Sequence, residues 1–330
     1  MGKSWIMKSW VLETLILPNR SIKAYFSQIS LSLTSLLPQL PNHIQPSPLW
    51  NSLAFSTIDS IAPWTSGRGL IRDCDKEETS QIRRGTTLTT TTMCTLEQRG
   101  NLFFLTLTGD NEHRLGPTLL DSIRSALAQV KSQATPGSAL ITTAQGKFFS
   151  NGLDLAWAQA AGSSSFRDRL SHLLDCFKPI VADLLSLPMP TIAAVSGHAA
   201  AAGFMLAISH DYVLMKNDRS VLYMSELDIG LSFPDYFMAM LKSKISDPAS
   251  RRDVMLRAKK VKAEEAVRMG IVDSAYDSAE STMEAAVRLA EQLTGRKWDG
   301  EVYAEIRKAI HSEVCGLLGL SHRAVVAPRL

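Results

Sequence analysis

Two glycine-bearing turns decide the fold expected of this chain: residues 146–155 are GKFFSNGLDL, and residues 196–205 are SGHAAAAGFM. Each turn follows a β-like run, and residues 190–195, PTIAAV, form the run before the second. A third segment, residues 225–231 (SELDIGL), places an acid among apolar residues soon afterwards. One glycine turn is weak evidence, because glycine suits many tight backbones. The order and spacing of all three segments are much more specific.

Strand and helix signals alternate on both sides of these turns. Pro117 opens an amphipathic helix, and a helical pattern over residues 166–187 stops before Pro188. Beyond Ala249 the pattern is mainly helical. We therefore expect an α/β core followed by a helical layer. The expected strands span residues 101–108, 139–143, 191–195 and 212–215, and the expected helices begin near residues 117, 166, 202, 251, 263, 281 and 301.

The composition indicates an ordinary globular protein, with 45% hydrophobic and 20% charged residues. A net charge of +3 is too small to indicate nucleic-acid binding, although it suits a polyanionic ligand. The four cysteines, at positions 74, 94, 176 and 315, show no metal-ligand spacing. We therefore expect no metal site, and scattered thiols favour a reducing compartment.

One apolar stretch, residues 191–208, has about the length of a membrane-spanning helix. Ser196, Gly197 and His198 interrupt it, and most of its bulk is alanine, which is only weakly lipophilic. We interpret the stretch as a buried strand, a tight turn and a buried helix, with no membrane span.

The chain changes character near Met93. Between residues 1 and 72 the only acidic residues are Glu13 and Asp59, and no sustained periodicity is present. We expect residues 1–92 to form a poorly ordered N-terminal extension. It is a targeting segment, an accessory region, or an upstream stretch included by an over-long gene model. We favour the last, because Met93 begins a segment with the signals of a complete domain.

The three segments resemble the crotonase superfamily, also called the enoyl-CoA hydratase/isomerase family, from about Leu96 onward. Residues 147–157 and 223–236 look like the plant peroxisomal enoyl-CoA isomerases of that family, which convert 3-enoyl-CoA into trans-2-enoyl-CoA. The resemblance implies a spiral core of ββα units over residues 93–260 and a helical region over 261–330. It further implies an acyl-CoA substrate, no separate cofactor, and a homotrimer or homohexamer.

Proton removal beside a thioester carbonyl places negative charge on the thioester oxygen. Two backbone N–H groups aimed at that oxygen stabilise it, each by about 3–4 kcal/mol. The resemblance assigns these donors to Leu153 and to Ala202, where a helix N-terminus also favours an anion. It further implies substrate-binding roles for the neighbouring small or polar residues and for one arginine near the adenine side of CoA. These candidates are Arg114, Gly152, Asp154, Ala201 and Gly203.

The acids distinguish between two reactions of the family. Its hydratases resemble one another in using two glutamates, and the positions that match here are Met205 and Glu226. A thioether moves no proton, whereas one carboxylate can carry a proton from the α carbon to the γ carbon. We therefore expect an isomerase with Glu226 as its base. Asp235 is the alternative base. The rival functions are a hydratase and a non-catalytic acyl-CoA-binding homologue.

The last three residues, Pro328-Arg329-Leu330, resemble the S-K-L peroxisomal address. Together with acyl-CoA chemistry, this tripeptide predicts a peroxisomal enzyme of fatty-acid β-oxidation that the import receptor binds at its C-terminus.

Overall fold

The computed structural model describes residues 93–162 and 165–325. The expected N-terminal extension, residues 1–92, and the tripeptide 328–330 lie outside the described residues.

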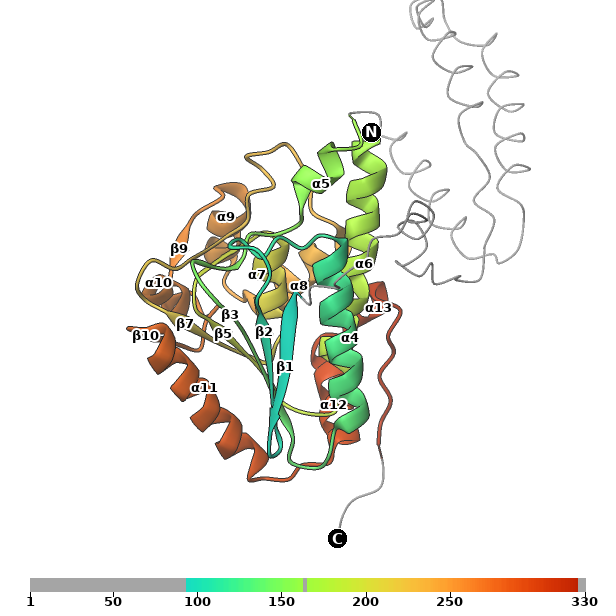
Figure 1. The fold of residues 1–330 in the computed structure, drawn as a ribbon, viewed down its shortest axis with the longest axis vertical. Helices are drawn as coiled ribbons and strands as arrows, with labels where there is room; N and C mark the ends of the chain where they lie inside the picture. The colour runs from blue at the N-terminus through green and yellow to red at the C-terminus, as the bar shows by residue number, and fades with distance from the viewer. Residues whose placement is uncertain (1–92, 163–164, 326–330) are drawn as a thin grey trace, which may run out of the picture. The chain divides into compact units, whose positions relative to one another are not determined.

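Two sheets form the framework of the described chain (Figure 1). In the larger sheet β1 runs antiparallel to β2, and every other neighbouring pair is parallel. Its strands in spatial order are β1 (Cys94–Arg99), β2 (Leu102–Leu107), β3 (Ala139–Ala144), β5 (Thr191–Val195), β7 (Tyr212–Lys216) and β10 (Ser274–Tyr276). The smaller sheet has the order β4 (Phe148–Ser150), β6 (His198–Ala200), β8 (Val221–Tyr223) and β9 (Val261–Lys262).

The chain winds as a spiral in which each turn gives one strand to each sheet. Thus β3, β5 and β7 of the larger sheet are followed by β4, β6 and β8 of the smaller one, and each pair is then followed by helix. The helices are α4 (Pro117–Gln133), α5 (Leu155–Gln159), α6 (Phe166–Ser186), α7 (Ala202–Ile208), α8 (Asp235–Lys244), α9 (Pro248–Leu256), α10 (Ala263–Arg268), α11 (Ala279–Thr294), α12 (Gly300–Ile310) and α13 (Ser312–Leu317). The spiral of ββα units expected from the sequence is confirmed.

Alternating side chains of the larger sheet enter two separate cores. Phe103 and Leu105 of β2 belong to the main core with α4 and α6, whereas Leu102 and Phe104 pack with α11. Figure 1 shows α11 on one side of this sheet and α4 and α6 on the other. Because successive strand residues point to opposite faces, a strand covered on both faces is apolar throughout.

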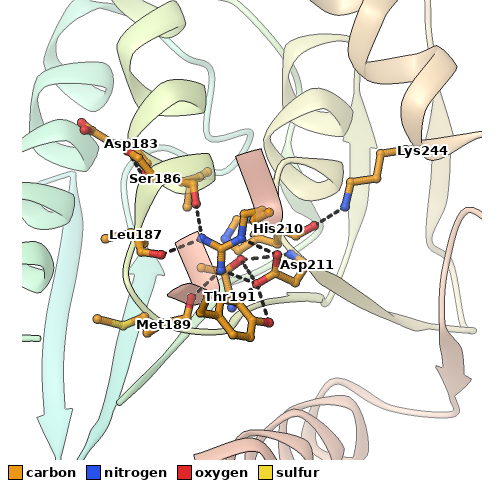
Figure 2. A network of polar contacts seen from close by, with 11 residues as sticks. Asp183, Ser186, Leu187, Met189, Thr191, His210, Asp211 and Lys244 are labelled. Atoms are coloured by element: carbon orange, nitrogen blue, oxygen red, sulfur yellow. Dashed lines mark hydrogen bonds and ion pairs between the residues drawn. The ribbon is translucent and has the colours of Figure 1, made fainter. Parts of the chain in front are cut away.

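A buried ion pair attaches helix α12 to the ends of the central strands. Arg307 is 3% exposed, and its Nε and Nη2 atoms each donate to the Asp211 carboxylate at 2.6 Å. Its Nη1 and Nη2 atoms also donate to the carbonyl groups of Leu187 and Met189, at 2.7 and 2.5 Å. Figure 2 shows these carbonyl groups and Asp211 converging from separate segments. The pair therefore joins the last helices to the α/β core.

The structure confirms the four expected strands and the seven expected helices to within a few residues. Residues 191–208 form β5, β6 and the buried helix α7, and no helix of the described chain is long and apolar enough to cross a membrane. The sequence did not reveal α8, which begins directly after Pro234. It also did not reveal the short helices α5 and α13 or the strands β1, β4, β6, β8, β9 and β10.

Candidate active site

Both glycine-bearing turns border one cavity of about 490 Å³. Leu153 of the first turn, Ala202 of the second and the acid Glu226 all line it. Much of the remaining wall is apolar and comes from α6 and from the segment that leads into α8. The cavity residues of this apolar wall include Leu170, Leu174, Leu231, Phe233 and Phe237. The structure therefore brings the three segments singled out in the sequence to one place.

The first turn holds the Leu153 amide in place without giving it a partner. Gly152 has φ of +80°, a left-handed backbone that favours glycine. The Leu115 N–H donates to the Gly152 carbonyl at 2.8 Å, and the Asp154 N–H donates to the Leu115 carbonyl at 3.2 Å. These bonds fix the groups on either side of Leu153, whose own N–H has no acceptor within the described chain.

The second turn presents another amide in a strained backbone. Ala201 has φ of +48° and ψ of −120°, a conformation that costs a residue with a Cβ about 1–3 kcal/mol. Its N–H donates to the Tyr223 carbonyl at 2.9 Å, which helps to hold this conformation. Ala202 is the first residue of α7, so its N–H has no acceptor within the helix.

The two turns touch each other through their glycines. A Cβ built on Gly152 would lie 3.1 Å from the Ala200 carbonyl oxygen and 3.6 Å from the Ala202 nitrogen. A Cβ on Gly203 would overlap the backbone of Ser150. Only residues without a side chain allow this approach. Two free amides thus meet at one side of the cavity, which suits an oxygen that gains negative charge.

Glu226 supplies the carboxylate of the cavity. It is 7% exposed, and its Oε2 atom has no hydrogen-bond partner in the described structure. Burial raises the pKa of Glu226 from the ordinary 4.5 to about 7, while backbone N–H groups of Ser225 and Glu226 oppose the rise. A carboxylate with this pKa exchanges a proton readily at neutral pH, as a general base must.

The other acid positions lie elsewhere. Asp235 is the exposed first residue of α8 and is not in the cavity wall, and Asp228 is also exposed. Met205, which stands where a second glutamate would be expected, is fully buried in the main core. Glu226 is therefore the one acid that the described residues place in the wall of this cavity.

The substrate-binding candidates separate into two groups. Arg114 and Ala201 line the cavity, whereas Gly152, Asp154 and Gly203 do not. Gly152 and Gly203 bring the two turns together, as described above. The Asp154 carboxylate accepts the Trp157 N–H at 3.0 Å and so caps α5.

The sequence analysis did not identify five polar residues of the cavity wall: Asn151, Arg167, Ser171, Ser225 and Ser232. Arg167 and Ser171 lie on the same face of α6 as Leu170 and Leu174, at the i, i+3, i+4, i+7 spacing of one helix face. This spacing was visible in the sequence, but only the fold shows that the N-terminal part of that face borders the cavity.

A larger hollow of about 1060 Å³ lies along α12 and contains none of the predicted site residues. Its lining includes Trp298, Tyr303, Ile306 and Ile310. Size alone does not identify an active site, and this hollow contains neither glycine turn.

Comparison with known proteins decides the family. A profile of the enoyl-CoA hydratase/isomerase family matches residues 103–314. The chain belongs to this family. It is 61% identical over 240 residues to the peroxisomal enoyl-CoA delta isomerase 2 of Arabidopsis thaliana, covering 72% of this chain and 100% of the relative. It is also 58% identical over 230 residues to enoyl-CoA delta isomerase 3 of the same plant, covering 69% of this chain and 96% of the relative.

Solved structures of the enoyl-CoA hydratase/isomerase family confirm the fold. An enoyl-CoA isomerase of Mycobacterium tuberculosis has a TM-score of 0.61 at 19% identity and covers 69% of this chain and 95% of its own. An enoyl-CoA hydratase of Mycobacterium ulcerans has a TM-score of 0.62 at 21% identity, with the same two shares. The α/β crotonase-type fold expected from the sequence is therefore correct.

Proposed function

We propose that this member of the enoyl-CoA hydratase/isomerase family is a peroxisomal enoyl-CoA delta isomerase, which converts 3-enoyl-CoA into trans-2-enoyl-CoA. The observation that carries the proposal is the Glu226 carboxylate, whose Oε2 atom has no hydrogen-bond partner, in a cavity with two free amides. The relatives named enoyl-CoA delta isomerase support it, because this chain spans 100% and 96% of the two compared.

In the proposed mechanism the thioester oxygen accepts hydrogen bonds from the Leu153 and Ala202 amides. Glu226 then takes a proton from C2, and the electron pair left behind is shared by C2, C3, C4 and the thioester oxygen. The two amides stabilise that charge. Glu226 returns the proton to C4, so the double bond now joins C2 and C3. No atom is gained or lost, and the same carboxylate serves as base and then as acid.

Hydration is the alternative reaction, and Met205 argues against it. Addition of water requires one group to activate the water and another to deliver a proton. The matching position for the second acid is a thioether buried in the core, and Asp235 lies outside the cavity. A non-catalytic acyl-CoA-binding protein would have no use for a buried carboxylate without a cationic partner, because burying such a group lowers the stability of the fold.

The substrate itself supplies the coenzyme A, and we propose no further cofactor. Arg114 at the cavity wall is the candidate contact for the CoA phosphates.

We also propose a homotrimer or homohexamer. Ile306 and Ile310, 57% and 68% exposed on α12, form an apolar surface that such an assembly would cover.

The first of the two plant relatives is named as a peroxisomal protein, and we propose the same compartment for this chain. The tripeptide Pro328-Arg329-Leu330 would be the part that the import receptor binds. A fluorescent protein ending in the last twelve or so residues should collect in peroxisomes and should stay cytosolic once Leu330 is deleted. An unchanged distribution would count against the tripeptide.

The decisive experiment for the reaction compares substrates by ultraviolet absorbance. With 3-enoyl-CoA, the purified protein should produce the conjugated 2-enoyl thioester. With 2-enoyl-CoA, it should cause little loss of that absorbance. Rapid loss of the conjugated signal would indicate a hydratase, and binding without any spectral change would indicate a non-catalytic homologue.

A further inference from the structure

The loop between β2 and α4 is tied tightly to the first turn. The Asn151 N–H donates to the Glu112 carbonyl at 2.9 Å, and the Ser150 hydroxyl donates to the His113 carbonyl at 2.7 Å. His113 is 2% exposed, has φ of +46°, and contacts the Phe148 carbonyl through Nδ1 at 2.9 Å. A left-handed backbone at a buried histidine persists only where its surroundings enforce it. The loop and the first turn therefore behave as one unit.

One carboxylate oxygen in this unit has two different donors. Oε2 of Glu112 accepts Nε of Arg114 at 2.6 Å and Nδ2 of Asn151 at 3.2 Å. Arg114 and Asn151 both line the cavity, whereas Glu112 does not. Glu112, whose side chain is 41% exposed, thus joins a cation of the cavity to the residue two positions before Leu153.

Arg114 still has donors to offer. Its contact with Glu112 uses Nε, and its two terminal nitrogens have no protein acceptor among the described residues. Its side chain is 32% exposed, so solvent-borne anions can reach it. A phosphate that binds the terminal nitrogens would pull on a guanidinium whose other side is held by Glu112. The Asn151 side chain donates to the same carboxylate oxygen, so a movement of Glu112 would also shift Asn151.

We propose that Glu112 is a positioning residue that couples phosphate binding at Arg114 to the placement of the Leu153 amide. The inference rests on the proposed function, in which Arg114 contacts the CoA phosphates. Contacts remote from the reacting atoms raise kcat when their binding energy is used to orient the catalytic groups. Glu112 provides such a route, because it touches both the phosphate-binding cation and the first turn.

The test compares two substrates: the 3-enoyl-CoA and the 3-enoyl-pantetheine thioester, which has the same acyl group and thioester but no phosphate. In the unaltered protein, truncation to pantetheine should lower kcat as well as raise KM. Glu112→Ala should lower kcat on the CoA thioester roughly 10-fold, while its effect on the pantetheine thioester stays within about 2-fold. Glu112→Gln keeps an acceptor oxygen and should retain most of the CoA-thioester activity.

Glu97→Ala is the matched control. Arg99 donates through Nε to Glu97 at 2.7 Å, with the same two-residue spacing as Glu112 and Arg114. That pair lies on β1 and is not part of the cavity, so its loss should change neither kcat nor the ratio of the two substrates. Melting temperatures of all variants would separate a folding defect from an effect on the site.

Equal losses of kcat on both substrates in Glu112→Ala would overturn the coupling, since they would mean that Glu112 only supports the turn. Unchanged kcat on both would overturn it too. In a double-mutant cycle, adding Glu112→Ala to Arg114→Met should give little further loss on the CoA thioester, and additive losses would contradict the proposal. An unaltered protein that isomerises neither substrate would instead remove the proposed function, and this inference with it.

Discussion

Asp211 and Glu226 are both buried carboxylates, yet their surroundings are opposite. Arg307 contacts both oxygens of Asp211, and the Thr191 N–H donates to Oδ2 at 2.9 Å. Burial opposes the charge of Asp211, but the Arg307 guanidinium, together with the Thr191 N–H and Lys244, outweighs burial and holds the pKa of Asp211 below the usual range. Glu226 has no cationic partner, so burial raises its pKa to about 7.

The difference shows that burial alone does not decide what an acid does. A buried carboxylate with a guanidinium stays charged and serves the fold, because separating the pair leaves an uncompensated charge. A buried carboxylate without a cationic partner exchanges its proton near neutral pH and is available for catalysis. Four predictions test this contrast.

Glu226→Gln should nearly abolish isomerisation. Glutamine keeps the size of the side chain but cannot accept the C2 proton, so kcat should fall by about 10³–10⁴-fold, the upper part of the range for loss of a general base. KM should change little, because the amides and the cavity walls remain. Steady-state kinetics on 3-enoyl-CoA measures both quantities. Turnover close to that of the unaltered protein would refute the role of Glu226.

Arg307→Met should destabilise the fold while leaving the site intact. It removes the guanidinium from Asp211 and leaves a buried charge, which costs about 3–5 kcal/mol. Urea unfolding followed by fluorescence would give the change in the free energy of unfolding. Arg288→Met on α11 is the control and should cost far less, because the side chains of Arg288 and its partner Glu284 are 64% and 69% exposed. Equal costs for the two variants would contradict the structural role of the Asp211 pair.

The pH dependence of both activity and stability should follow the titration of Glu226. Only its deprotonated form accepts the C2 proton, so kcat/KM should rise roughly 10-fold per pH unit below about pH 7 and level off above it. The sign for stability is opposite: a carboxylate whose pKa is raised on folding contributes stability that is lost as pH rises from 4.5 to about 7. Glu226→Gln should therefore be more stable than the unaltered protein at pH 8. A flat activity profile between pH 5 and 8 would contradict the raised pKa.

Asp235→Asn should have the smallest effect, within about 2-fold on kcat, because exposed residues outside a site rarely matter. Asp235 is exposed at the start of α8 and does not line the cavity. The same kinetic assay applies. If Asp235→Asn is inactive while Glu226→Gln is active, Asp235 and not Glu226 is the catalytic base.

The local features of the molecule were the ones that the sequence predicted. Four of the strands (β2, β3, β5 and β7), most helices and both turns follow from periodicity and from glycine and proline positions, which act over a few residues. The apolar surroundings of Glu226 in the sequence agree with its burial, although its neighbours Leu227 and Ile229 are themselves 55% and 49% exposed.

The features that remained hidden depend on distant contacts. Nothing near Glu112 in the sequence indicates that its carboxylate meets Asn151, 39 residues later. Helix α8 was missed because Pro234 and the irregular run before it read as a loop, and with it the cavity residue Phe237 was lost. Local patterns carry no information about which segments meet, and tertiary packing decides those contacts.

The pairing of Asp211 with Arg307 has a consequence for the order of synthesis. The two residues are 96 positions apart, so a growing chain carries Asp211 well before its guanidinium has been made. Until then, α12 cannot cover the ends of the central strands. Burying Asp211 before Arg307 has been made would leave a buried charge without its partner. The nascent protein therefore keeps this end of its central sheet open to solvent, and the last helices to leave the ribosome complete it.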